Sequence, residues 1–215
     1  MLSGVASAAL AIEPADLDNR IRTLTDKFEA FQHRPDNGIP SETLRRAQGI
    51  ILLDTAKGGL VVGYQGGSGV AMVKDAKQKK WSPAAFLKVN QASLGLQVGG
   101  EESFYIILLM TTNSTWRLID PKIEFGAGAG GTVGDSTGGV ATKAPSEQEM
   151  LVYKDRVGLY GGAIVKGGGI SFDGEANRIY YGQDLSMRDI LFGHKVQPSA
   201  TAAHLAGEIH SYAHK

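Results

Sequence analysis

Gly66-Gly67-Ser68-Gly69-Val70-Ala71-Met72-Val73 is the stretch that decides the fold, because it interleaves glycine with apolar residues over the length of a β-strand. The same texture recurs at residues 58–64, 95–100 and 158–165, and 29 of the 215 residues are glycine. Glycine inside a strand marks a bulge, a sharp bend or a close approach of two backbones. The pattern therefore predicts a curved, glycine-rich antiparallel β-sheet or a partly closed barrel.

The segments around this sheet predict a single α+β domain with helices from the N- and C-terminal segments. Apolar residues recur at steps of three and four over residues 12–33, which indicates an amphipathic helix. The apolar run at residues 104–110 is typical of a buried central strand. Further helices are expected at 41–48, 112–118, 175–181, 186–192 and 201–213. Further strands are expected at 50–53, 60–64, 70–74, 93–98, 123–130, 150–156, 159–165 and 169–172, with a glycine turn at 66–69 and a loop at 131–146. We expect structural roles for four glycines, Gly95, Gly99, Gly161 and Gly162.

The composition excludes several classes of protein. Apolar residues make up 42% and charged residues 20% of the chain, which is a globular balance. The formal net charge is zero, so no global attraction to nucleic acid or membrane is implied. The absence of cysteine excludes disulfides and thiolate zinc sites. Any binding to a charged partner must come from a local patch.

The N-terminal residues resemble the end of a secretory signal. Residues 2–11 read LSGVASAALA, a small apolar run that ends in an A-x-A-like motif, although the basic n-region is missing. We expect residues 1–11 to be a signal-peptide remnant, or else a flexible leader, followed by one domain over residues 12–215. The expected location is periplasmic or secreted with peripheral membrane association, and the alternative is cytoplasmic.

Motifs for catalysis, cofactors and metals fail on their context. Residues 126–131 match G-x-G-x-x-G, but the glycine-rich residues that follow cannot start the helix that a dinucleotide site needs. Three histidines crowd the last predicted helix, His204, His210 and His214. His210 and His214 are spaced i, i+4 and could bind zinc or nickel weakly, but a solvated helix explains them better. We expect no enzymatic activity, no cofactor and no metal.

A series of short motifs is more specific when taken in order along the chain. It comprises residues 46–51 (RAQGII), 57–59 (KGG), 67–70 (GSGV), 81–83 (WSP), 93–101 (SLGLQVGGE), 152–153 (VY), 158–162 (GLYGG), 177–182 (NRIYYG) and 190–191 (IL). This series resembles the SYLF domain family, with a match over about residues 42–193. The family includes yeast actin-patch proteins, animal phosphoinositide-binding proteins and bacterial proteins. The chain is similar to a stand-alone, bacterial-type member.

The resemblance implies non-enzymatic binding of anionic phospholipid headgroups at a membrane surface, as phosphoinositides are bound in eukaryotic members. The alternative is a protein-interaction or structural module, actin-regulator-like or envelope-associated, without lipid binding. The expected partners are an anionic phospholipid or membrane surface and a protein, but not nucleic acid.

A cluster of lysines beside a tryptophan is the candidate lipid-binding site. Lysines near an anionic surface attract it, and an indole suits the headgroup boundary. The alternative reading is a solvated connector whose tryptophan is folded into the core. The candidate residues are Lys74, Lys77, Lys79, Lys80 and Trp81.

Overall fold

The computed structural model describes residues 12–35, 38–55, 66–75, 78, 80–90, 103–120, 149–155, 158–159 and 170–215. The helices are α1 (Pro14–Gln32), α2 (Ser41–Arg46), α3 (Thr112–Trp116), the 3-10 turn η2 (Arg117–Ile119), α4 (Gly174–Tyr181), α5 (Met187–Leu191) and α6 (Ala200–Ala213). The strands are β1 (Gly49–Thr55), β2 (Gly66–Val73), β3 (Ala85–Asn90), β4 (Ser103–Leu109), β5 (Met150–Lys154), β6 (Gly158–Leu159) and β7 (Ile170–Phe172).

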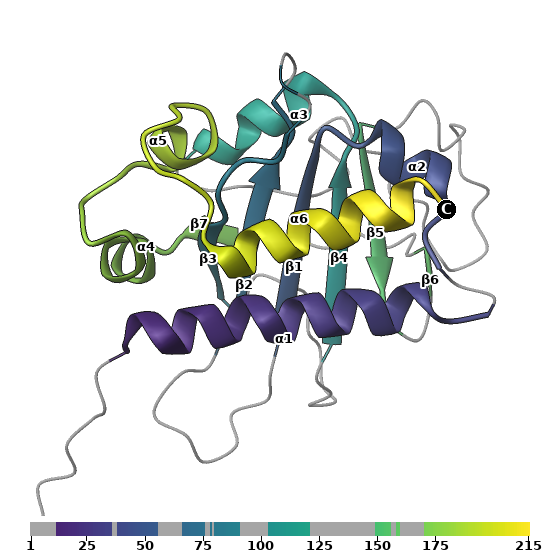
Figure 1. Cartoon of the computed structure of the whole chain (residues 1–215), viewed down its shortest axis with the longest axis horizontal. Coiled ribbons are helices and arrows are strands. Elements are labelled where there is room, and N and C mark those ends of the chain that lie inside the picture. The colour runs from purple at the N-terminus through teal and green to yellow at the C-terminus, as the bar shows by residue number, and fades with distance from the viewer. Residues whose placement is uncertain are drawn as a thin grey trace, which may run out of the picture.

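The described strands form one antiparallel sheet in the order β6-β5-β4-β1-β2-β3-β7 (Figure 1). At its centre, Leu52 of β1 pairs with Val70 of β2 and with Ile106 of β4. The edge strands β6 and β7 do not pair with each other within the described residues, so this sheet is open. The prediction of an α+β fold around an antiparallel sheet is confirmed, while the barrel alternative is not found.

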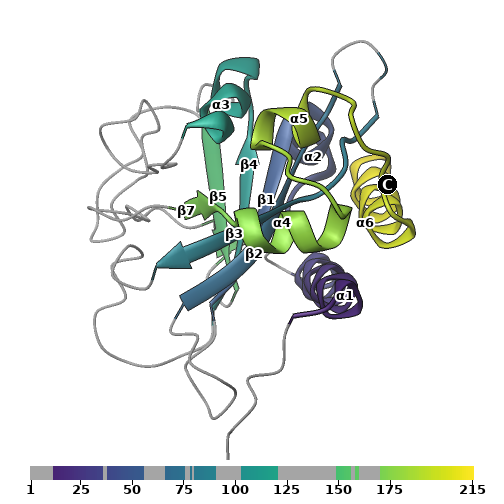
Figure 2. The same ribbon diagram turned by 90° about the vertical axis from the view of Figure 1, so that its left-hand side faces the viewer.

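Both faces of the sheet are buried. Ile50 and Leu52 of β1 belong to a core that also contains residues of α1, α2 and α6. Ile51 and Leu53 point the other way, into a second core with residues of η2 and α5. Figure 2 shows α1 and α6 together on one side of the sheet. Burial on both faces explains why the central strands read as continuous apolar runs rather than alternating ones.

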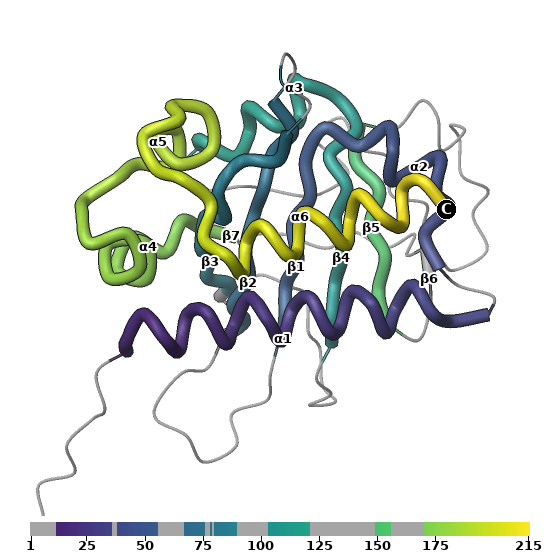
Figure 3. The backbone as a smooth tube through the Cα atoms, in the orientation of Figure 1, coloured from purple at the N-terminus to yellow at the C-terminus, as the bar shows by residue number. Residues whose placement is uncertain are grey.

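Helix α1 buries the apolar stripe that its sequence predicts. The buried stripe consists of Leu17, Ile21, Leu24, Phe28 and Phe31. Pro14 stands at the first turn, where a missing N–H costs nothing. In the chain trace, α1 and α6 run side by side in the same direction, although they come from distant parts of the sequence (Figure 3). Their shared outer surface is therefore built from both ends of the described chain.

The glycines of β2 correct one prediction. Residues 66–69 were expected to form a turn, but they belong to the strand β2, and residues 67–69 pair with β1. A Cβ atom on Gly69 would lie 2.1 Å from the carbonyl oxygen of Leu52, and one on Gly67 would lie 2.9 Å from that of Asp54. Glycine is needed here because the two backbones approach closely, which is one of the roles predicted for it.

The strand β3 was not predicted from the sequence. It follows Pro83 and pairs with β2 and β7. Of the five β3 side chains whose burial is described, four are buried and Lys88 is exposed, so the strand shows no alternation that would mark it. Several other predictions lie outside the described residues: the strands at 60–64, 93–98 and 123–130, most of the strand at 159–165, the loop at 131–146, and Gly95, Gly99, Gly161 and Gly162.

Two polar contacts fasten the C-terminal helices to the rest of the molecule. The buried Asn177 of α4 hydrogen-bonds the main chain of Phe86 in β3. Asp18 of α1 accepts hydrogen bonds from Tyr180 of α4 and Thr201 of α6. The hydroxyl of Thr201, followed by that of Tyr180, lowers the pKa of Asp18 below its ordinary value. α1, α4 and α6 are thus joined around one carboxylate.

Candidate functional site

The segment after β2 folds back so that two of the predicted lipid-binding residues meet. Lys74 and Trp81 form an antiparallel bridge, and the N–H of Asp75 donates to the carbonyl of Lys80 at 2.8 Å. The ammonium of Lys74 lies 5.2 Å from the centroid of the Trp81 ring. That distance is within the range of a cation–π interaction. The hairpin therefore fixes a cation on an aromatic ring.

The remaining predicted residues are lysines with different placements. Lys80 is exposed beside Trp81. Lys77 and Lys79 lie outside the described residues. Trp81 itself is half-buried and packs against the core between α1 and the sheet. One part of the indole is therefore fixed in the interior, while the rest is available at the surface.

A cavity of about 300 Å³ opens beside Lys74 and Trp81, which we call the Trp81 groove. It lies between α2, the hairpin and the C-terminal half of α6. Its volume is at the lower end of the range for small-molecule sites. The lining residues are Leu44, Arg45, Gln48, Lys74, Trp81, Ile209, His210, Ala213 and His214.

The charges at the Trp81 groove are of one sign. Arg45 and Lys74 carry positive charge. The ammonium of Lys74 donates to the carbonyl oxygen of Arg45 at 3.1 Å, which holds it at the rim. Arg45 also forms an ion pair with Glu42 of α2. Because no lining residue in the described part of the chain is a carboxylate, the groove suits an anionic group.

The predicted lipid-binding residues did not include Arg45 or the two histidines. The rings of His210 and His214 lie against each other at a tilt of 33°, with their centroids 4.1 Å apart, and the Nδ1 of His214 lies 2.8 Å from the carbonyl oxygen of His210. They were interpreted as a solvated helix face, and both are indeed exposed. No local signal links them to Lys74, because only the packing of α2 and α6 brings the three segments together.

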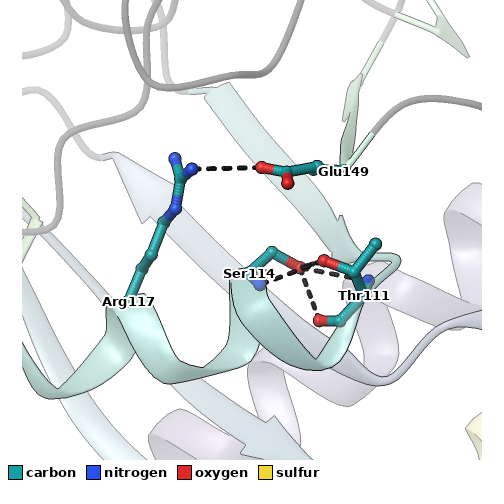
Figure 4. Close-up of polar contacts among 4 residues, drawn as sticks. All are labelled: Thr111, Ser114, Arg117 and Glu149. Carbon is teal, nitrogen blue, oxygen red and sulfur yellow. Dashed lines mark hydrogen bonds and ion pairs between the residues drawn. The ribbon is translucent and has the colours of Figure 1, made fainter.

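A second group of polar side chains stands at the start of α3, and it has a structural role. Figure 4 shows that Thr111 and Ser114 face each other there and that Arg117 reaches toward Glu149. The N–H of Ser114 donates to the Thr111 hydroxyl at 3.1 Å, and the N–H of Thr111 donates to the Ser114 hydroxyl at 3.2 Å. This reciprocal arrangement is a capping box. Arg117 and Glu149 are 3.1 Å apart and tie η2 to the start of β5.

The sequence predicts peripheral contact with a membrane, and the length and composition of the helices show whether any of them could cross one. No helix in the described part of the chain combines the length and the apolar character needed to cross a bilayer.

Comparison with known proteins gives a family and several relatives. The family model Ysc84, described as Las17-binding protein actin regulator, matches residues 90–212. The human SH3 domain-containing YSC84-like protein 1 is 28% identical over 178 residues, which cover 77% of this chain and 49% of that protein. LAS seventeen-binding protein 3 of Saccharomyces cerevisiae is 29% identical over 174 residues, covering 77% of this chain and 37% of that protein. The Xenopus laevis YSC84-like protein 1 is 28% identical over 197 residues, covering 86% and 58%. The chain thus spans about half or less of the length of the human and yeast relatives.

Proposed function

The chain belongs to the Ysc84 (SYLF) family of actin regulators, and from this membership we propose that it is a non-enzymatic binding module whose partner is a protein. The yeast relative is named for binding LAS seventeen, and the family description names actin regulation. The family match includes β4, β5 and the helix α6 that forms one wall of the Trp81 groove. Arg45, Lys74 and Trp81 precede this match, so the family model covers the α6 wall of the groove but not its cations or its indole.

The observation that carries this proposal is the Trp81 groove. It presents cations from α2 and the hairpin beside an indole ring, and its described lining includes no carboxylate. Tryptophan and arginine are the side chains that most often dominate the binding energy of protein interfaces. An acidic segment of a partner would gain charge pairing with Arg45 and Lys74 and contact with Trp81.

The test is binding of the purified chain to filamentous actin by co-sedimentation, and to purified Las17 by pull-down, each at low and high salt. We expect binding to at least one of them that weakens with salt, because exposed charges are screened. Lys74→Glu should weaken it, whereas Lys88→Glu, an exposed lysine of β3 outside the groove, should not. Absence of binding to both proteins at low salt would contradict the proposal.

A second candidate function is the binding of an anionic phospholipid headgroup, which the size and charge of the same groove favour. Each lysine near an anionic surface contributes about 1 kcal/mol. The four predicted lysines would together give roughly 4 kcal/mol, about a millimolar dissociation constant. Arg45 and the indole of Trp81 supply the further contact that stable attachment needs.

Vesicle co-sedimentation separates the two candidates. Vesicles with and without anionic lipid are compared at low and high salt, using the wild-type chain, Lys74→Glu and Lys88→Glu. If the chain binds lipid, the wild type should sediment with anionic vesicles but not with neutral ones, and Lys74→Glu should no longer sediment with either. A wild-type chain that binds a protein partner but no vesicle leaves the first function standing and removes the second.

We also propose export, on the signal-like sequence of residues 2–11. Sequencing the N-terminus of the protein recovered from its native host tests this. Cleavage after Ala11 would support it, and an intact leader on intracellular protein would contradict it.

A further inference from the structure

Three potential metal ligands converge on the outer surface where α1 meets α6. Glu29 comes from α1, while His204 and Glu208 come from α6, and the ligand atoms of all three lie within 4.8 Å of one another. His204 and Glu208 are four residues apart, so one face of α6 carries both. The two helices lie side by side in both views of the fold (Figures 1 and 2). The cluster is therefore made by tertiary packing and has no counterpart in any local motif.

Among the described residues, no positively charged side chain pairs with the two carboxylates of this cluster. Within the described residues, no hydrogen bond or ion pair engages the side chains of Glu29, His204 or Glu208. The negative charges of Glu29 and Glu208 affect the pKa of Tyr212, one turn further along α6. Burial is the main cause that raises the pKa of Tyr212, and the charges of Glu29 and Glu208 raise it further. Like charges held this close are unfavourable unless a cation lies between them.

We propose that Glu29, His204 and Glu208 bind a divalent transition-metal ion, with zinc as the best fit. Zinc accepts imidazole nitrogen and carboxylate oxygen at about 2.0–2.2 Å, which places tetrahedral ligands roughly 3.3 Å apart. Rotation of half-buried and exposed side chains can close the present spacing. Calcium and magnesium are less suitable, because they prefer ligand sets made of oxygen alone.

The site would leave a coordination position open. A cavity of about 380 Å³ lies between the same helices and shares His204 as a lining residue. Its other lining residues are Arg22, Thr25, Asp26, Ala200 and Thr201. Three protein ligands and a fourth position for water or a ligand from a partner are typical of accessible zinc sites. An ion held there joins α1 to α6 and stabilises the folded state.

The histidine pair His210 and His214 is the rival zinc site on the same helix. The Nδ1 of His214 is hydrogen-bonded to the carbonyl of His210, so the His214 ring offers only Nε2 to a metal ion. The pair also lacks a carboxylate ligand in the groove that it lines. The rival provides a matched control, because it has the same i, i+4 spacing as His204 and Glu208.

The test measures zinc chloride binding to the full chain by isothermal titration calorimetry, with thermal unfolding at increasing zinc. The variants are Glu29→Gln, His204→Asn and Glu208→Gln, and the control is the double variant His210→Asn/His214→Asn. We expect one zinc per chain with a micromolar dissociation constant and a melting temperature that rises with zinc. Each site variant should weaken binding at least tenfold and abolish that rise, while the control keeps both.

The metal-free proteins keep the result interpretable. Removing one of two repelling carboxylates should leave the melting temperature without zinc unchanged or higher in Glu29→Gln and Glu208→Gln, so a loss of binding cannot come from misfolding. Cobalt in place of zinc should give a visible absorption band that His204→Asn removes. The proposal is overturned if the wild type binds no zinc up to millimolar concentrations. It is also overturned if binding persists in the site variants or disappears in the control.

Discussion

Replacing Asn177 by alanine tests whether one buried amide holds α4 against the edge of β3. The side chain is fully buried, with 0% exposed. Its Oδ1 accepts from the N–H of Phe86 at 3.0 Å, while its Nδ2 donates to the carbonyls of Phe86 at 2.9 Å and of Asp173 at 2.8 Å. The amide thus pairs with Phe86 as a neighbouring strand would, at a position that β7 does not reach.

The size of the effect follows from what each partner retains. The Phe86 carbonyl still accepts from the N–H of Asp173, and the Asp173 carbonyl still accepts from the N–H of Asn177. The N–H of Phe86 loses the partner that Asn177 supplies and stays buried, which costs about 1–3 kcal/mol. Two further hydrogen bonds contribute about 0.5–1.5 kcal/mol each. We therefore expect Asn177→Ala to lower the free energy of unfolding by about 3 kcal/mol.

The measurement is urea and thermal unfolding followed by circular dichroism. In a domain of this size, about 3 kcal/mol corresponds to a fall in melting temperature of roughly 6–12 °C. The matched control is Asn19→Ala on the exposed side of α1, where the side chain only accepts a hydrogen bond from Arg22. We expect this control to change stability by less than about 0.5 kcal/mol. A loss below about 1 kcal/mol in Asn177→Ala would refute the reasoning.

Three further predictions concern packing, charge and lipid contact. Gly69→Ala should lower the free energy of unfolding in urea by at least about 3 kcal/mol, because its Cβ would overlap the Leu52 backbone. Gly207→Ala has no atom near its Cβ and should stabilise α6. Equal effects of the two variants would contradict this prediction. Asp18→Asn should destabilise the fold at pH 7. Since the folded-state pKa of Asp18 is lowered, that difference should shrink as the pH falls below about 3.9, measured by unfolding across pH, and a pH-independent difference would be the contrary result. Replacing Lys77, Lys79 and Lys80 by glutamate should abolish sedimentation with anionic vesicles and leave the circular dichroism spectrum unchanged. If this variant sediments as the wild type does, residues 74–81 are only a connector.

Periodicity predicted the parts of the fold whose signal is local. The apolar stripe of α1 and the apolar run of β4 were placed within one or two residues of their observed bounds. Glycine was harder to interpret, because residues 66–69 have a turn-like composition and yet form part of β2. The strand is distinguished from a turn by the close approach of the β1 backbone to Gly69, which is a tertiary contact.

The candidate site divides in the same way. Lys74 and Trp81 are seven residues apart, and a β-bridge joins these two members of the predicted site. Arg45 and His210 come from segments far from this hairpin, so only the packing of α2 and α6 adds them to the groove. A single sequence therefore shows which residue types are available for binding, but not which of them tertiary packing brings together.

The pairing of α1 with α6 has a consequence for biosynthesis. A ribosome releases α1 early, whereas α6 follows roughly 180 residues later, a delay on the order of 10–40 s at ~5–20 residues per second. During that interval the nascent chain displays the apolar side of α1, including Phe28, whose later neighbour Tyr212 is still to be translated. Aggregation in this window, or capture by a chaperone, competes with productive folding. Ribosome-bound chains that stop before Ala200 should therefore be more sensitive to proteases than released full-length chains.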